Sequence, residues 1–99
     1  MRNFTIILSA LATREIEAAA AWWAERGSPT RIDGAVAKVL RQLQAFPESA
    51  PRARSRGRWS RMRHAPVDPG YRLYYRLDVE RALILIERFW STRRPPPRL

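Results

Sequence analysis

The feature that most constrains the fold is the stretch of residues 59–90, in which three β-forming segments follow one another closely. These segments, residues 58–64, 71–77 and 82–90, are rich in aromatic and aliphatic side chains. Residues 65–70 form the first connection, where Asp68, Pro69 and Gly70 are a strong turn signal, and residues 78–81 form the second. Because such short connections join antiparallel neighbours, the sequence predicts a three-stranded antiparallel meander.

Side-chain alternation predicts the faces of these strands. The core face of the middle strand consists of Tyr71, Leu73, Tyr75 and Leu77. Its other face carries Arg72, Tyr74 and Arg76. In the first strand, one face carries Trp59, Arg61 and Arg63, and the other carries Ser60, Met62 and His64. Residues 83–86 of the last strand are continuously apolar, so we expect this strand to be central and buried on both faces.

The upstream half of the chain predicts a strand and two helices. Residues 4–8 are rich in β-formers, and Ser9 or Thr13 offers an N-cap oxygen for a helix that runs to about Arg26. Gly27 then supplies a stop. A second helix is expected from Ser28, as capping residue before a proline, to about Ala45. Residues 47–57 read as a basic loop, and residues 91–99 as a tail of prolines and arginines.

The order strand, helix, helix, strand, strand, strand predicts an α+β fold. The two helices form a hairpin that packs on one face of a small, mainly antiparallel sheet. The chain has 99 residues, a length that suits one domain covering residues 1–99. No segment reaches the roughly 18 consecutive apolar residues of a membrane span, so we expect no membrane partner and a cytoplasmic location.

The charge of the chain indicates an anionic partner. The net charge is +10, and Lys38 is the only lysine, so arginine carries nearly all of the positive charge. Arginine forks match phosphate and carboxylate groups, and the arginines between residues 52 and 63 have no acidic residue among them. Such a run is either solvated surface or a contact surface, and Trp59 within it favours contact. With no cysteine and one histidine, we expect no metal site.

Several motifs together resemble the RelE/ParE superfamily of bacterial toxins. Met62-Arg63, a turn and then residues 70–75 (Gly-Tyr-Arg-Leu-Tyr-Tyr) are similar to the core signature of that superfamily. Three further features are similar: Ser9-x-x-Ala12 after the opening strand, Leu43-x-x-x-Pro47 after the helices, and Arg93-Arg94 after the last strand. The resemblance covers essentially the whole chain.

The resemblance implies the toxin of a type II toxin–antitoxin pair. Its first expected partner is a cognate antitoxin, usually encoded by the adjacent gene, whose acidic or amphipathic segment would suit a basic surface. The superfamily includes ribosome-dependent mRNA endonucleases of the RelE type and inhibitors of DNA gyrase of the ParE type. The target is therefore expected to be gyrase or the ribosome with its mRNA.

Candidate catalytic residues follow from the RelE comparison. Arg63 fits the strand arginine of that group, and Arg93 fits the arginine after the last strand, but the C-terminal tyrosine has no counterpart here. His64 is a candidate general base and Tyr74 a candidate phenol, although a lone histidine near a turn is more often a surface residue. Arginine does not lose its proton in proteins and cannot act as a proton shuttle.

The sequence lacks a clear acid–base pair, which favours a ParE-like inhibitor that acts by binding without cofactor or metal. A RelE-like endoribonuclease and a non-toxic basic module that binds nucleic acid remain the alternatives. The residues expected to contact the target or the antitoxin are Arg58, Trp59, Arg61, Arg63, Arg72, Arg76, Arg93 and Arg94.

Overall fold

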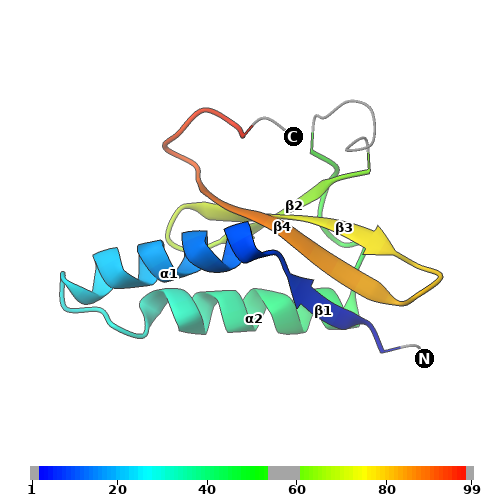
Figure 1. The fold of residues 1–99 in the computed structure, drawn as a ribbon, viewed down its shortest axis with the longest axis horizontal. Helices are drawn as coiled ribbons and strands as arrows, with labels where there is room; N and C mark the ends of the chain where they lie inside the picture. Colours follow the sequence, from blue (N-terminus) through cyan, green and yellow to red (C-terminus); the bar gives the residue numbers. More distant parts are fainter. Residues whose placement is uncertain (1–2, 54–60, 98–99) are drawn as a thin grey trace.

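The computed structural model of the chain describes residues 3–53 and 61–97. The described residues form the elements β1 (Thr5–Leu8), α1 (Ala10–Ala24), α2 (Arg31–Ala45), β2 (Arg63–Val67), β3 (Tyr71–Asp78) and β4 (Leu83–Ser91). This is the predicted order of strands and helices. The two helices run side by side and cover one face of the sheet, and the C-terminal tail lies on the other side (Figure 1).

The four strands form one sheet in the order β1-β4-β3-β2. The meander is confirmed, because β3 pairs antiparallel with both β2 and β4. The first strand pairs parallel with the last, with Thr5 opposite Leu83 and Leu8 opposite Ile86. The predicted central place of β4 is therefore confirmed, with β1 on one side and β3 on the other (Figure 1).

Helix α1 begins as the sequence predicts. Ser9 takes an extended backbone conformation, and its Oγ accepts a hydrogen bond of 2.9 Å from the backbone N–H of Ala12. Gly27, at φ +84°, ends the helix. The N–H of Ser28 donates to the carbonyl of Trp23, and the N–H of Gly27 donates to that of Ala24. These two bonds form the Schellman pattern, which closes the helix after a left-handed glycine.

The predicted start of the second helix was wrong. Ser28 belongs to the closing turn of α1, so it does not cap α2. Pro29 lies outside α2, immediately before its N-cap residue. The N-cap residue is Thr30, whose side chain makes no capping hydrogen bond. From Arg31 onward the apolar spacing holds, and the inward residues of α2 are all buried: Ile32, Val36, Val39 and Leu43.

The core lies between the helices and one face of the sheet. Helix α1 contributes Ala12 and Ile16. The strands contribute Ala65, Val67, Leu73, Tyr75, Ile84, Ile86 and Phe89. The expectation that β4 is buried on both faces was wrong, because Leu83 and Leu85 are only partly buried. Their side chains point to the face that neither helix covers, so the apolar run in the sequence overstated the burial.

Strand β2 lies further along the chain than the sequence predicts. It runs from Arg63 to Val67, whereas the alternation favoured residues 58–64, of which 58–60 lie outside the described residues. Pro66 fell within the predicted connection of residues 65–70, but it lies in β2. This strand is at the edge of the sheet, and a proline fits there because its nitrogen needs no partner. The connection to β3 is consequently only residues 68–70, with Gly70 at φ +104°.

The part of the predicted loop that lies within the described residues, 47–53, is held against the sheet. The N–H of Ala53 donates to the carbonyl of Met62, and the N–H of His64 donates to that of Pro51. The hydroxyl of Tyr75 donates to the carbonyl of Pro47 at 2.8 Å. Through these bonds the connector after α2 becomes a fixed extension of the β2 edge.

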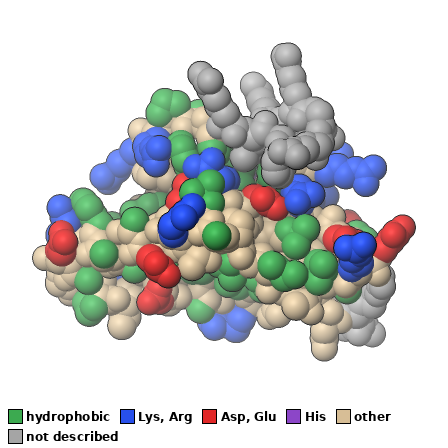
Figure 2. All heavy atoms as spheres, viewed as in Figure 1, with side chains coloured by type: hydrophobic (Ala, Val, Ile, Leu, Met, Phe, Trp, Pro, Cys, Tyr) green, Lys and Arg blue, Asp and Glu red, His purple; other side chains and the backbone are tan. Residues whose placement is uncertain are grey.

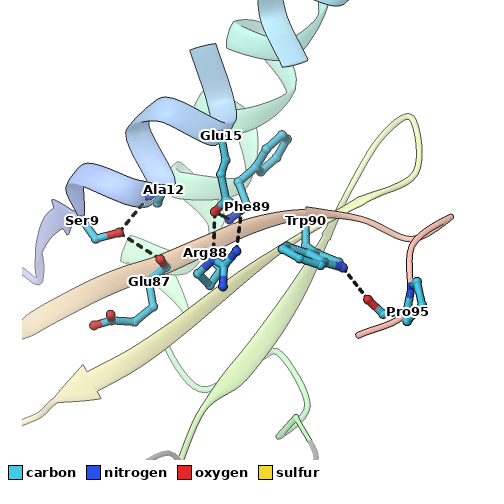
Figure 3. Close-up of polar contacts among 8 residues, drawn as sticks. All are labelled: Ser9, Ala12, Glu15, Glu87, Arg88, Phe89, Trp90 and Pro95. Carbon is cyan, nitrogen blue, oxygen red and sulfur yellow. Dashed lines mark hydrogen bonds and ion pairs between the residues drawn. The ribbon is translucent and has the colours of Figure 1, made fainter. Parts of the chain in front are cut away.

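Side chains from the start of α1 complete the edge of β4 (Figure 3). Strand β1 ends opposite Ile86, yet β4 continues to Ser91. Beyond that point Ser9 Oγ donates to the carbonyl of Glu87 at 2.9 Å. The Glu15 carboxylate accepts the N–H of Phe89 at 3.1 Å and two N–H groups of the Arg88 guanidinium at 3.0 and 2.9 Å. Polar groups that would otherwise be left unpaired are thereby satisfied.

We predict that Glu15→Ala destabilises the protein by about 2–3 kcal/mol, measured by urea unfolding followed by circular dichroism. The substitution leaves a mostly buried guanidinium and a strand N–H without their acceptor. Glu17→Ala is the matched control, because Glu17 is exposed on the same helix and its loss should cost less than about 0.5 kcal/mol. Equal effects of the two substitutions would show that the Glu15 interaction does not hold α1 to β4.

Candidate target-binding surface

The face of the sheet opposite the helices carries a group of polar and aromatic side chains, which we call the open face. Alternation and register assign to it His64 from β2, Arg72, Tyr74 and Arg76 from β3, and Arg88 and Trp90 from β4. In the view of Figure 2, basic side chains lie at several places around the molecule, some of them on the side of the strands and the tail. Of the residues that the sequence indicated for target contact, this face carries Arg72 and Arg76.

His64 and Tyr74 lie opposite each other on β2 and β3, and their rings stack. The ring centroids are 5.8 Å apart, with an angle of 28° between the ring planes. Burial lowers the pKa of His64 below its ordinary value of 6.5, and the positive charge of Arg72 lowers it further. The neutral imidazole is therefore the main form at pH 7. Tyr74 is only 5% exposed, so its ring is largely covered.

The arginines expected on this surface fall into two groups. Arg76 pairs with Glu87 at 3.0 Å, and Glu87 is the extra residue where the register of β4 shifts against β3. Arg88 pairs with Glu15 at 2.9 Å. Arg72, by contrast, is exposed opposite Trp90, and within residues 3–53 and 61–97 it has no ion pair. The paired arginines hold the fold together, whereas Arg72 presents its charge to solvent.

Arg63 serves the connector rather than the open face. Its Cα lies opposite Tyr75, on the face that the helices cover. The guanidinium donates to the carbonyl of Ala50 at 2.6 Å and to that of Glu48 at 3.2 Å. Arg61 is exposed in the turn before β2, and Arg58 and Trp59 lie outside the described residues. The arginines of the basic run therefore do not form one described surface.

Trp90 organises the chain after β4. Its Nε1–H donates to the carbonyl of Pro95 at 2.7 Å, which folds the tail back onto the strand (Figure 3). The guanidinium carbons of Arg88 and Arg94 lie 4.7 and 3.7 Å from the centroid of the Trp90 ring. These are cation–π distances. Arg94 is therefore positioned next to the open face.

Arg93 faces a different feature, a groove between α1 and the sheet with a volume of about 420 Å³. The floor and walls of the groove are largely aromatic, with Trp22, Trp23, Tyr71 and Phe89. The side chain of Trp22 is 44% exposed, and Trp23 Nε1–H donates to the hydroxyl of Tyr71 at 3.1 Å. Arg93 and Arg94 both contribute to the lining. The sequence pattern placed Tyr71 on a core face but did not predict this groove, because the separation of α1 from the tail cannot be seen in a linear pattern.

Glu15 is the residue that the sequence reading missed. It lies one position before the inward Ile16, so its place on the flank of the buried stripe was the available signal.

Among the described residues, no group of three His, Cys, Asp or Glu side chains is placed to bind a metal ion. Within the same residues, neither helix has the length and apolar character needed to cross a bilayer.

Three solved structures from toxin–antitoxin systems share the fold of this chain. The first is a chain of the RelBE2 toxin–antitoxin complex from Mycobacterium tuberculosis, with 20% identity and a TM-score of 0.64 over 91% of this chain and 99% of that chain. A chain of the chromosomal ParDE system from P. aeruginosa has 14% identity and a TM-score of 0.59, over 89% and 95%. YafQ from E. coli has 18% identity and a TM-score of 0.61, over 91% and 94%. At these identities the likenesses show the fold alone.

No curated protein matches the chain. A family model does match, and its description is the ParE toxin of the type II toxin–antitoxin system parDE. The match covers residues 6–96, from β1 through the open face to the tail. The chain therefore belongs to the ParE toxin family of type II toxin–antitoxin systems.

Proposed function

We propose that this protein is a ParE-like toxin that inhibits growth by binding DNA gyrase in the cytoplasm. The observation that carries the proposal is the match of the ParE toxin family to residues 6–96, which includes every strand of the open face. Binding suffices for such an activity, and the exposed charge of Arg72 and Arg94 beside Trp90 supports it. Arginine and tryptophan are the residue types that contribute most to the affinity of protein interfaces.

We further propose that a cognate antitoxin, encoded by the adjacent gene, neutralises the toxin. Two of the solved structures with this fold are toxin–antitoxin complexes, RelBE2 and DinJ–YafQ. The groove between α1 and the sheet would suit an amphipathic acidic segment, because its aromatic lining can bury apolar side chains while Arg93 pairs with a carboxylate. The net charge of +10 would speed the association with an acidic partner.

Expression should stop growth, and co-expression of the adjacent gene should restore it. We predict that Arg93→Ala weakens antitoxin binding about tenfold, because it removes a charged contact at the groove. Isothermal titration of the purified antitoxin into the toxin measures this change. Arg14→Ala, an exposed position on the outer side of α1, is the control with the same change in charge. Unimpaired growth in several hosts would contradict the toxin assignment and favour a plain nucleic-acid-binding module.

Gyrase inhibition depends on the open face in this proposal. We predict that Arg72→Ala raises the concentration for half-inhibition of DNA supercoiling about tenfold, whereas Arg41→Ala, an exposed arginine on α2, changes it less than about twofold. Arg63→Ala is not a clean test, since Arg63 holds the connector through two carbonyl groups. If supercoiling proceeds normally at saturating toxin, gyrase is not the target.

A RelE-like mRNA endonuclease is the second candidate, and the stacked pair of His64 and Tyr74 beside Arg72 favours it. A neutral imidazole can accept the proton of a ribose 2′-hydroxyl, and a nearby guanidinium can stabilise the charge on the phosphate. This function predicts cleavage of mRNA on translating ribosomes that His64→Gln abolishes. Intact mRNA in that reaction would exclude the second candidate, whatever the outcome with gyrase.

The titration of His64 tests the electrostatics of the open face directly, because the chain has one histidine. We predict an NMR midpoint below 6.5, and a shift upward in Arg72→Ala, since part of the lowering comes from the charge of Arg72. The folded-state pKa lies below the unfolded one, so the contribution of His64 to stability is present above pH 6.5. It is lost as the pH falls through the lowered pKa. A midpoint at or above 6.5 would contradict this description.

A further inference from the structure

A small hollow lies on the open face where β3 and β4 meet the tail. Its volume is about 100 Å³, and it is lined by Arg72, Tyr74, Trp90, Ser91, Thr92, Arg94 and Pro96. Two of these residues are cationic, none is acidic, and three carry hydroxyl groups. Within residues 3–53 and 61–97, neither Arg72 nor Arg94 has an ion pair. The hollow therefore carries positive charge that the described part of the fold does not neutralise.

The positions of both arginines are defined by the structure around them. Arg72 extends from β3 opposite Trp90. Arg94 reaches the same tryptophan from the tail, with its guanidinium carbon 3.7 Å from the ring centroid. The tail is held by the Trp90 bond to Pro95 and by Thr92, whose N–H and hydroxyl both donate to the carbonyl of Gly70. The two cations are thus brought to one hollow by contacts that leave both without an acidic partner among residues 3–53 and 61–97.

We infer that this hollow is a binding site for a phosphomonoester group. A phosphomonoester carries between one and two negative charges at pH 7 and has three acceptor oxygens, so it matches two guanidinium groups better than a single carboxylate does. A hollow of about 100 Å³ has room for a phosphate group. The nucleoside or nucleic-acid strand that carries the phosphate would remain outside the mouth of the hollow.

The lowered pKa of His64 agrees with this assignment. Burial is the main cause of the lowering, and the positive charge of Arg72 adds to it, so Arg72 contributes a positive potential at this end of the open face. The inference is independent of whether gyrase or the ribosome is the target, because it concerns a ligand group and not the inhibited machine. Its test therefore needs neither of them.

The experiment compares two fluorescent oligonucleotides of one sequence, one with a 5′-phosphate and one with a 5′-hydroxyl, by fluorescence anisotropy at fixed ionic strength. The full chain should bind the phosphorylated strand about tenfold more tightly, because charge-assisted hydrogen bonds to the terminal group add to the general attraction for the backbone. Arg94→Ala and Arg72→Gln should each remove this preference. Arg41→Ala, with the same loss of charge away from the hollow, should retain it.

Further arms identify the source of the phosphate and test the role of the tail. Displacement by AMP but not by adenosine would indicate a free nucleotide, and displacement only by a 5′-phosphorylated strand would indicate a strand end; both agree with the inference. Trp90→Phe should weaken the preference while the far-ultraviolet circular dichroism is unchanged, because the tail that carries Arg94 loses the hydrogen bond from Trp90 Nε1–H to the carbonyl of Pro95. Equal affinity for the two oligonucleotides, or stronger displacement by an acidic peptide than by AMP, would overturn the phosphate site.

Discussion

The structure depends on satisfying the edge of β4 beyond the point where β1 ends. β4 lies between β1 and β3 in the sheet. It is longer than β1, so part of its edge on the β1 side extends beyond the four residues that β1 can pair with. The start of α1 supplies the remainder through the hydroxyl of Ser9 and the carboxylate of Glu15. These bonds fix where α1 leaves the sheet. The direction of α1 then determines the groove on one side and keeps the helices away from the open face.

The same constraint explains how the arginines are divided. Arg88 and Arg76 face the open side, but each has an acidic partner within the fold, so their charge stabilises the sheet. Arg72 and Arg94 lie around Trp90 without such a partner among residues 3–53 and 61–97. A surface whose cations are partly neutralised at fixed positions is more selective than an evenly basic one, because an anionic partner gains only where charge remains. Net charge alone does not reveal that distinction.

Much of the fold could be predicted from the sequence because its signals are local. Ser9, Gly27 and the spacing of Ile32, Val36 and Val39 act within a few residues, and the structure confirms them. The predictions failed where one residue has two possible local roles. Ser28 was assigned to the start of α2, although it closes α1. Pro66 was assigned to a turn, although an edge strand accommodates it.

The candidate surface was less predictable than the fold. Arg63 and Arg72 both occupy strand positions where the alternation predicts an exposed arginine. Arg63 nevertheless hydrogen-bonds to the connector, whereas Arg72 is exposed to solvent. The outcome depends on where residues 47–53 lie, which no local pattern in β2 or β3 specifies. Glu15 is likewise defined by a partner 73 positions away. Position on a face could be derived from the sequence, whereas the partner of each charge could not.

The parallel pairing of β1 with β4 has a consequence for the time at which the sheet can be completed. Thr5 pairs with Leu83, so the sheet lacks a strand until residues 83–86 have been synthesised. At about 5–20 residues per second, roughly 4 to 16 seconds separate the synthesis of the two partners. Pairing over so long a separation is also intrinsically slow. A nascent chain thus cannot present a finished open face before β4 and the residues that follow it have been synthesised.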